Sequence, residues 1–288
     1  MGNNMALANY FSDISSSRNP VWVDGLDYSR AVLNQGKALP WGDTAALVAF
    51  FQKQQQLLRS DIVMIDLFDF FQVWTQSRPE LLQAMAKKSR LNYAIKILLE
   101  DAAAIEQLRD FFKALASVKG SEPLMVKVPS PKLWMGMAFS LAHAGENPTV
   151  AWKDAERAAV YIAGFLRAFG DTGIDGLLIV DEEGLGPANG EELASYQSLL
   201  NVAEHFRWAI GLYNPGVELN ASDNALDCVI SNSAQGGGCS GLILDQLWSS
   251  GEAGNLPPAN FYYTTVPEQT EPAKVLASLE YVRDTRSE

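Results

Sequence analysis

Histidine and cysteine are scarce in this sequence, which has two of each among 288 residues. Two cysteines give no disulfide framework, and we expect both to remain free thiols. A catalytic zinc site needs about three protein ligands, and neither His143 nor His205 follows a predicted strand. Each histidine is therefore expected at the surface or in helix packing, and the sequence predicts a site without zinc or another cofactor.

Long apolar segments and clusters of basic residues are missing as well. No stretch reaches the ~18 apolar residues of a membrane span, and residues 1–13 lack the basic and then apolar layout of a secretory signal. We therefore expect a soluble, cytoplasmic protein with no membrane partner. The net charge of −12 and the lack of any basic run argue against nucleic acid as a partner.

What the sequence does contain is an ordinary globular composition, with 48% hydrophobic and 19% charged residues. This length can bury one large core, so we expect one domain spanning residues 1–288. The oligomeric state stays open. No G-x-G-x-x-G follows an early predicted strand, which leaves a dinucleotide site without support.

Short apolar runs recur along the chain and predict its architecture. They lie at residues 20–25, 62–69, 93–101, 123–131, 176–184, 208–216, 228–233 and 261–268. Continuous apolarity is typical of parallel strands that are buried on both faces, and helical patterns separate several of the runs. Eight strands that alternate with helices predict a single (β/α)₈ barrel, with an open, doubly wound sheet as the alternative.

Two stretches are ambiguous in this scheme. The run at 93–101 continues to residue 118 in a pattern that also fits one long helix. The stretch "QGGGCSG" at 235–241 is rich in glycine but lacks the Lys-Ser/Thr ending of a phosphate loop. We expect it to be a flexible turn near the mouth of the barrel. Cys239 is then the cysteine that could approach the site, because Cys228 begins a strand at the opposite end.

The run Leu177–Val180 ends abruptly in three acids, Asp181, Glu182 and Glu183. In a barrel the carboxyl ends of all strands meet at one mouth, where barrel enzymes place their sites. Three adjacent acids repel one another, so at least one is expected to pair with a cation or to have a raised pKa. Lys127 is the nearest cation in strand order.

Polar residues that follow the other apolar runs complete the candidate site. We assign catalytic roles to Asp181, Glu182 and Lys127. The residues expected to bind substrate are Asp24, Asp66, Ser130, Tyr213, Asn214, Ser231 and Asn232. Two simpler interpretations stay open, in which Asp181 only caps a turn and Glu183 only meets solvent. Because Lys127 can offset no more than one of the three acids, the mouth is expected to attract a small molecule that carries an amine.

Three segments resemble a known superfamily. They are "VKVPSP" (126–131), "DAERAAVYIAGFLRAFGDTGIDGLLIVDEEGL" (154–185) and "FYYTTVPEQTEPAKVLASLEYVRD" (261–284). Together they resemble the cobalamin-independent methionine synthase and uroporphyrinogen decarboxylase superfamily. The resemblance implies a (β/α)₈ barrel, and it implies that Asp181 and Glu182 match the acidic position that holds the substrate.

The sequence departs from both branches of that superfamily. The methionine synthase branch binds zinc through a His-x-Cys at a place where this chain reads "GLYNPG" (211–216). The decarboxylase branch gathers carboxylates with an arginine-bearing loop, where this chain has Arg30 beside two aspartates. A polycarboxylate would be repelled at such a mouth.

These observations favour a metal-independent barrel enzyme that acts on a small substrate with an amine or amino-acid group. Methyl or alkyl transfer is the candidate reaction. Two alternatives stay open: a lyase or decarboxylase of the same superfamily, and a non-catalytic binding or partner protein that has lost the zinc site. A carboxylate with a shifted pKa would favour an enzyme, because a general acid or base needs one and a binding protein does not.

Overall fold

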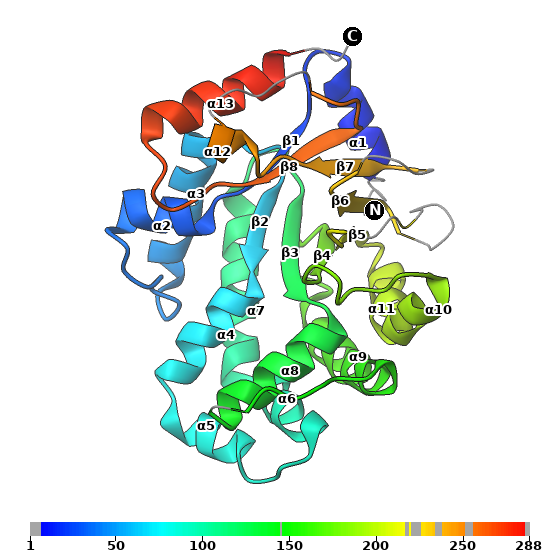
Figure 1. Ribbon diagram of the computed structural model, residues 1–288. Helices are drawn as coiled ribbons and strands as arrows, with labels where there is room; N and C mark the ends of the chain where they lie inside the picture. Colours follow the sequence, from blue (N-terminus) through cyan, green and yellow to red (C-terminus); the bar gives the residue numbers. More distant parts are fainter. Residues whose placement is uncertain are drawn as a thin grey trace.

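The computed structural model describes residues 7–144, 146–216, 219, 226–233, 238–250 and 256–285. Within these residues, eight parallel strands form one sheet in the order β1-β8-β7-β6-β5-β4-β3-β2 (Figure 1). The strands are β1 (Val21–Asp24), β2 (Val63–Asp66), β3 (Leu124–Pro129), β4 (Gly176–Val180), β5 (Ala209–Tyr213), β6 (Cys228–Ser231), β7 (Ser240–Ile243) and β8 (Phe261–Thr265). The prediction of a (β/α)₈ barrel is confirmed.

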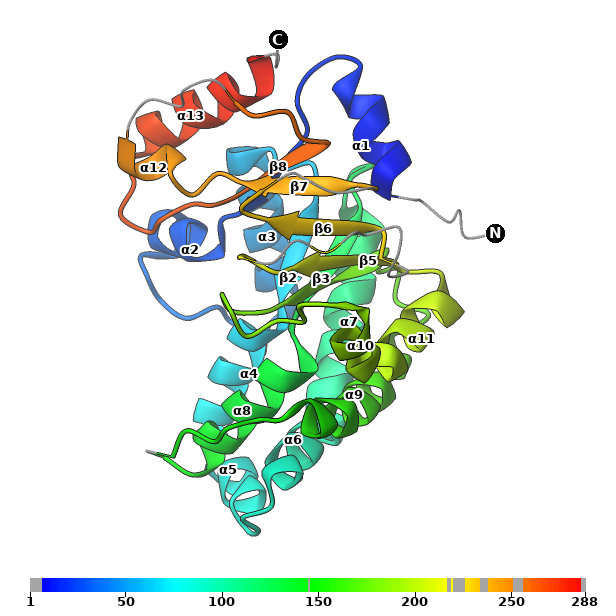
Figure 2. The ribbon, with the colours of Figure 1, turned by 45° about the vertical axis from the view of Figure 1, so that its right-hand side comes forward.

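Helices surround the sheet, and on one side they form an additional layer. They are α1 (Leu7–Ser15), α2 (Leu26–Asn34), α3 (Thr44–Leu58), α4 (Leu67–Gln76), α5 (Pro79–Met85), α6 (Leu91–Leu99), α7 (Ala102–Val118), α8 (Pro131–Ala142), α9 (Trp152–Leu166), α10 (Gly190–Leu193), α11 (Gln197–Phe206), α12 (Leu247–Ser250) and α13 (Pro272–Asp284). Figure 2 shows that α4, α5, α6, α8 and α9 build a helical layer beyond the carboxyl ends of β2 and β3. In the described part of the chain, no helix is both long and apolar enough to cross a bilayer.

The barrel closes between β1 and β2 without a direct ladder between these two strands. Residues just before β2 supply the contacts instead. The backbone N–H of Val21 donates to the Asp61 carboxylate (2.7 Å), and the Asp61 N–H donates to the carbonyl of Val21 (3.0 Å). The N–H of Val23 donates to the Ser60 hydroxyl (2.9 Å). These bonds satisfy backbone groups that an open sheet edge would expose.

Side chains alternate along each strand between the interior of the barrel and its outer face. The interior holds an apolar cluster that includes Trp22, Met64, Met125 and Leu178. Phe11 of α1 joins this cluster, and its ring stacks on Phe261, the first residue of β8, with centroids 4.2 Å apart. Helix α1 therefore closes the amino-terminal end of the barrel.

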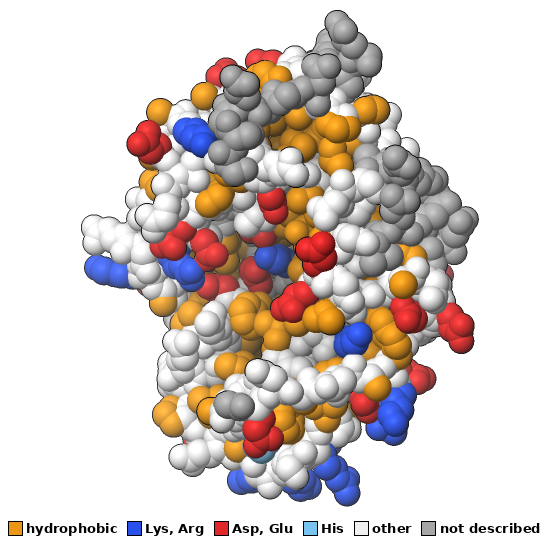
Figure 3. All heavy atoms as spheres, viewed as in Figure 1, with side chains coloured by type: hydrophobic (Ala, Val, Ile, Leu, Met, Phe, Trp, Pro, Cys, Tyr) orange, Lys and Arg blue, Asp and Glu red, His pale blue; other side chains and the backbone are white. Residues whose placement is uncertain are grey.

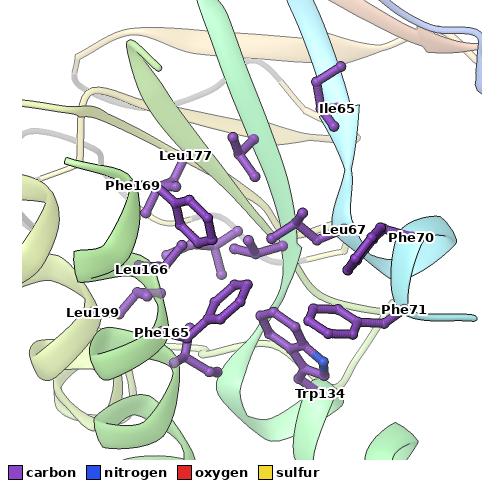
Figure 4. Packing of buried hydrophobic residues seen from close by; sticks show 14 of the residues in the cluster. Ile65, Leu67, Phe70, Phe71, Trp134, Phe165, Leu166, Phe169, Leu177 and Leu199 are labelled. Atoms are coloured by element: carbon purple, nitrogen blue, oxygen red, sulfur yellow. The ribbon is translucent and has the colours of Figure 1, made fainter. Parts of the chain in front are cut away.

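The larger core lies between the sheet and the outer helices. Aromatic rings from different helices meet there, as Figure 4 shows for Phe71 of α4, Trp134 of α8 and Phe165 of α9. The ring centroids of Phe71 and Phe165 are 5.6 Å apart, and those of Trp134 and Phe165 are 6.1 Å apart. Such contacts join α4, α8 and α9 to one another. Helix α4 follows β2 and α8 follows β3, and the carboxyl ends of both strands carry candidate site residues.

The prediction of a strand at residues 93–101 is wrong. This run forms α6, and Ala94, Ile95, Leu98 and Leu99 are its buried residues. That spacing fits a helix with one buried face rather than an alternating strand. The alternative of one helix to residue 118 is wrong as well, because Asp101 accepts a hydrogen bond from the N–H of Ala103 and begins α7.

The missing strand is β7, which lies at the end of the glycine-rich stretch, where the sequence predicts a turn. Gly241 belongs to β7, and a Cβ at this position would lie 2.4 Å from the ring of Phe261 on β8. The glycine is therefore required for strand packing. Cys239 precedes β7, and its carbonyl accepts a hydrogen bond from Val229 of β6. Both Cys228 and Cys239 belong to the interior cluster near the amino-terminal end, so the expectation that Cys239 could approach the mouth is wrong.

Candidate active site

The carboxyl ends of the strands face a hollow on one side of the molecule. Acidic side chains gather around this hollow in Figure 3, with few basic ones between them. Two cavities at these strand ends hold most of the candidate residues. One is small and lies beside β1 and β2, and the other is larger and lies beside β4, β5 and β7.

The small cavity, of about 240 Å³, has Lys127, Asp24 and Asp66 in its wall. The ammonium of Lys127 lies 2.7 Å from Asp24 Oδ2 and 3.0 Å from Asp66 Oδ2. The hydroxyl of Tyr263 also donates to Asp24 Oδ2, at 3.1 Å. Burial by itself lowers the pKa of Lys127, but the charges of Asp24 and Asp66 outweigh it and raise that pKa well above its ordinary value. The lysine is therefore a fixed cation.

This pairing corrects the expectation that Lys127 offsets one of the acids after Val180. Lys127 and Asp66 are direct register partners on β3 and β2, and both belong to the inward-facing positions. On the other side, the register partner of Lys127 is Leu178. The acidic run begins three residues beyond Leu178, past the end of β4. The structure shows no ion pair between Lys127 and Glu182.

The larger cavity, of about 690 Å³, contains the acidic run itself. The lining residues are Val180, Asp181, Glu182, Glu183, Tyr213, Pro215, Asn232, Ile243, Asp245 and Gln246. Four of these carry carboxyl groups, and no lysine or arginine is among the described residues that line the cavity. Glu182 and Glu183 are exposed, so their carboxylates are open to a ligand that enters from solvent.

Asp181 is buried, with 1% of its surface exposed. The hydroxyl of Tyr196 donates to Asp181 Oδ2 at 3.1 Å. Burial raises the pKa of Asp181 to about 6, although Ser130, Tyr196 and the charge of Lys132 act against this rise. The sequence predicts that repulsion among the acids forces a cation partner or a raised pKa. A raised pKa is found, but burial is its main cause and Glu182 contributes least.

Some of the remaining candidate residues make hydrogen bonds within the fold, and others line one of the two cavities. Ser130 is buried and accepts the N–H of Leu133 at the start of α8. Asn214 is buried and donates to the carbonyl of Pro187, which ties β5 to the loop after β4. Ser231 donates to the carbonyl of Ser233 (2.6 Å). Of the predicted binding residues, Tyr213 and Asn232 line the larger cavity, and Asp24 and Asp66 line the smaller one.

Sequence reasoning missed Asp245, Gln246 and Tyr196. Asp245 lines the larger cavity, and its pKa is raised, chiefly by burial, although the N–H of Thr265 donates to it. A signal for Asp245 exists, because it follows the apolar residues Leu242–Leu244 in the same way that Asp181 follows β4. Tyr196 is the last residue of the 3₁₀ turn Ala194–Tyr196, just before α11, and no strand-end pattern points to it.

In the part of the chain that the structure describes, no group of three or more His, Cys, Asp and Glu side chains is arranged to hold a metal ion. Asp24 and Asp66 have carboxylates, which can bind metal ions, but here both contact the ammonium of Lys127.

The fold and the site together define a (β/α)₈ barrel with an acidic cavity at its mouth. No protein-family model and no curated protein matches the sequence. Among solved structures, a methyltransferase from Methanosarcina mazei is similar, with a TM-score of 0.54 and 11% sequence identity, over 96% of this chain and 98% of that chain. At this identity the similarity concerns the fold alone.

Proposed function

We propose that this protein is a barrel enzyme of the methionine synthase and uroporphyrinogen decarboxylase type that binds a small substrate carrying an amine. The substrate occupies the 690 Å³ cavity at the mouth. The reaction we propose is methyl or alkyl transfer without a metal ion. A lyase or decarboxylase reaction is less compatible with this site, because the decarboxylase-like substrates carry carboxylates that four acids would repel.

The observation that carries the proposal is the unbalanced charge of the cavity. Asp181, Glu182, Glu183 and Asp245 line it with no lysine or arginine among its described lining residues. The interior cation, Lys127, is already engaged by Asp24 and Asp66. An ammonium group supplies the missing positive charge, and a charge-assisted hydrogen bond to a carboxylate contributes roughly 1.5 to 3 kcal/mol.

Asp181 supports an enzyme rather than a binding protein. In the proposed transfer the substrate ammonium first loses a proton, and its nitrogen then forms a bond to the methyl carbon of a second substrate, a sulfonium-type methyl donor. The carbon–sulfur bond of the donor breaks, and the donor leaves as a neutral thioether with the electron pair. A carboxyl group with a pKa of about 6 can accept that proton near neutral pH. Asp181 lines the same cavity as Glu182, so one acid can hold the substrate while the other accepts the proton. The methyltransferase with a similar fold supports the choice of reaction.

A screen of amines, amino acids and polycarboxylates by thermal shift and calorimetry tests the proposal. We expect cationic compounds to bind, and we expect Glu182→Gln to weaken their binding about tenfold or more. Glu191→Gln is the matched control, because Glu191 is also exposed and lies in the first turn of α10, away from the cavity wall. Exclusive binding of anionic compounds would refute the proposal.

One observation favours the alternative of a non-catalytic binding protein. The cluster of Lys127, Asp24, Asp66 and Tyr263 is satisfied within itself, as expected of a brace inside the barrel. The Asp181→Asn variant distinguishes an enzyme from a binding protein. If the amine is alkylated, this variant loses turnover and still binds the amine. If the protein only binds, no amine yields an alkylated product with either form.

A further inference from the structure

Helix α8 carries large apolar side chains, Leu133 and Met137, outside the face that attaches it to the core. Trp134, Met135, Ala138 and Phe139 are buried against the core. A second stripe, at i, i+3, i+4 and i+7, is only half-buried: Leu133, Gly136, Met137 and Ser140. A surface helix normally presents polar residues on the face away from the core. The second stripe of α8 therefore faces a space rather than another packed element.

That space is a cavity of about 600 Å³ between α8 and the segment 147–150. Leu133, Gly136, Met137, Pro148, Val150 and Leu185 give it a mainly apolar lining. The volume is in the range of small-molecule sites. Leu185 is 45% exposed at its rim, which places a large apolar side chain where a ligand can cover it.

The apolar cavity and the acidic cavity share a wall. Asp181 and Glu182 line both of them. The cation in the wall of the apolar cavity, Lys132, is engaged: its ammonium lies 4.2 Å from the centroid of the Trp152 ring and donates to the carbonyl of Leu185 at 3.2 Å. Asp181 and Glu182 thus form the acidic end of the apolar cavity, and Ser140, Asn147 and Thr149 add uncharged polar groups to its lining.

We propose that the substrate is an amphiphilic amine, whose ammonium group binds at Glu182, beside Asp181, and whose apolar part lies along the second face of α8. This inference rests on the proposed function, which places an amine at the acids. The inference adds that the rest of the substrate is apolar. Hydrophobic burial in the α8 cavity then contributes affinity that grows with the length of the apolar chain.

Gly136 gives a way to block the cavity without disturbing the acids. It lies within α8, where glycine is unfavourable, and a Cβ at this position would only touch Val150 Cγ2 at 3.5 Å. A larger side chain would therefore extend into the cavity and not into the core. Gly164 of α9 is the matched control, because it is an exposed helical glycine at which an added Cβ would meet no atom within 4 Å.

The experiment is calorimetry with n-alkylammonium chlorides from ethyl to hexyl, with n-alkyl alcohols and n-alkyl carboxylates of the same lengths alongside. For the unchanged protein we expect the affinity for the ammonium series to rise about three- to fourfold per methylene. Gly136→Leu should abolish this dependence and leave ethylammonium binding unchanged, whereas Gly164→Leu should keep it. Leu185→Asn, at the exposed rim, should weaken hexylammonium and not ethylammonium, and it tests the same cavity if Gly136→Leu folds poorly.

The outcomes separate the two proposals. If ethylammonium binds but chain length has no effect, the inference about the α8 cavity is wrong and the proposed function stands. A chain-length dependence that survives in both Gly136→Leu and Leu185→Asn also overturns the inference. Alcohols that bind as tightly as the matching amines would show that the apolar site is not joined to the acids. If only the carboxylates bind, the proposed function fails and this inference fails with it.

Discussion

At the scale of single residues, burial controls the chemistry of this site more than repulsion between neighbours does. Asp181 and Glu182 are adjacent in sequence, yet the first is buried and the second is exposed. Burial disfavours the ionised form of a carboxyl group, which explains the raised pKa of Asp181. The sequence predicts that one of the acids is perturbed. It does not show which one, because the answer depends on how deeply the fold buries each side chain.

The raised pKa of Asp181 predicts a dependence of stability on pH. The pKa is about 6 in the folded protein against an ordinary 3.8. The folded state therefore holds a proton more tightly than the unfolded state does. The stabilisation that this tighter proton binding gives the folded state is complete below pH 4 and is lost as the pH rises through 6. Asp181→Asn, which never ionises, should gain stability relative to the unchanged protein between pH 4.5 and 7.5, by up to roughly 3 kcal/mol.

Urea unfolding at several pH values between these limits measures this difference. Asp171→Asn is the control, because Arg109 and Lys113 lower the pKa of this surface carboxyl group. The shift is of opposite sign, so this variant should show no such gain. A stability difference for Asp181→Asn that stays constant with pH would show that Asp181 titrates in its ordinary range.

At the scale of elements, the sequence predicts strand and helix alternation well and misplaces one strand. The runs ending at Asp24, Asp66 and Val180 are short, continuous and followed by polar residues, and each forms a strand. The run at 93–101 misleads because a short apolar stretch does not distinguish a buried strand from a buried helix. Strand β7 escapes prediction because it has four residues and two of them, Ser240 and Gly241, are typical of turns.

The packing of β7 on β8 gives a prediction for that strand. A Cβ at position 241 would lie 2.4 Å from the Phe261 ring, so Gly241→Ala forces the ring or the strand to move. Overpacking of this kind costs typically about 1 to 3 kcal/mol. Gly164→Ala, in an exposed helix with free space, should instead stabilise by about 0.5 to 1 kcal/mol. Equal effects of the two substitutions in urea unfolding would contradict the packing described for β7.

The ion-pair partner of Lys127 could not be predicted from the sequence. Strand order correctly brings Lys127 to the carboxyl end of the sheet, beside β2 and β4. The choice between its neighbours depends on the residue-by-residue register, which aligns Lys127 with Asp66. Register follows from the packed barrel and not from the order of runs in the chain.

At the scale of the whole molecule, the barrel concentrates negative charge at one end. The chain has a net charge of −12, and the mouth gathers carboxylates around a hollow (Figure 3). A cleft lined by one sign of charge raises the local concentration of counter-ions. The helical layer that extends beyond β2 and β3 adds the apolar cavity beside those acids. The overall architecture therefore places an acidic cavity and an apolar cavity next to each other.

We propose that the acids after β4 hold the ammonium group of a ligand. A crystal structure of the protein with hexylammonium bound tests it most directly. We predict the nitrogen within hydrogen-bond distance of Glu182 or Asp181, with the alkyl chain against Gly136 and Met137 of α8. A nitrogen bound elsewhere, for example at Asp24 and Asp66 in place of Lys127, would show that these acids do not hold the ammonium group.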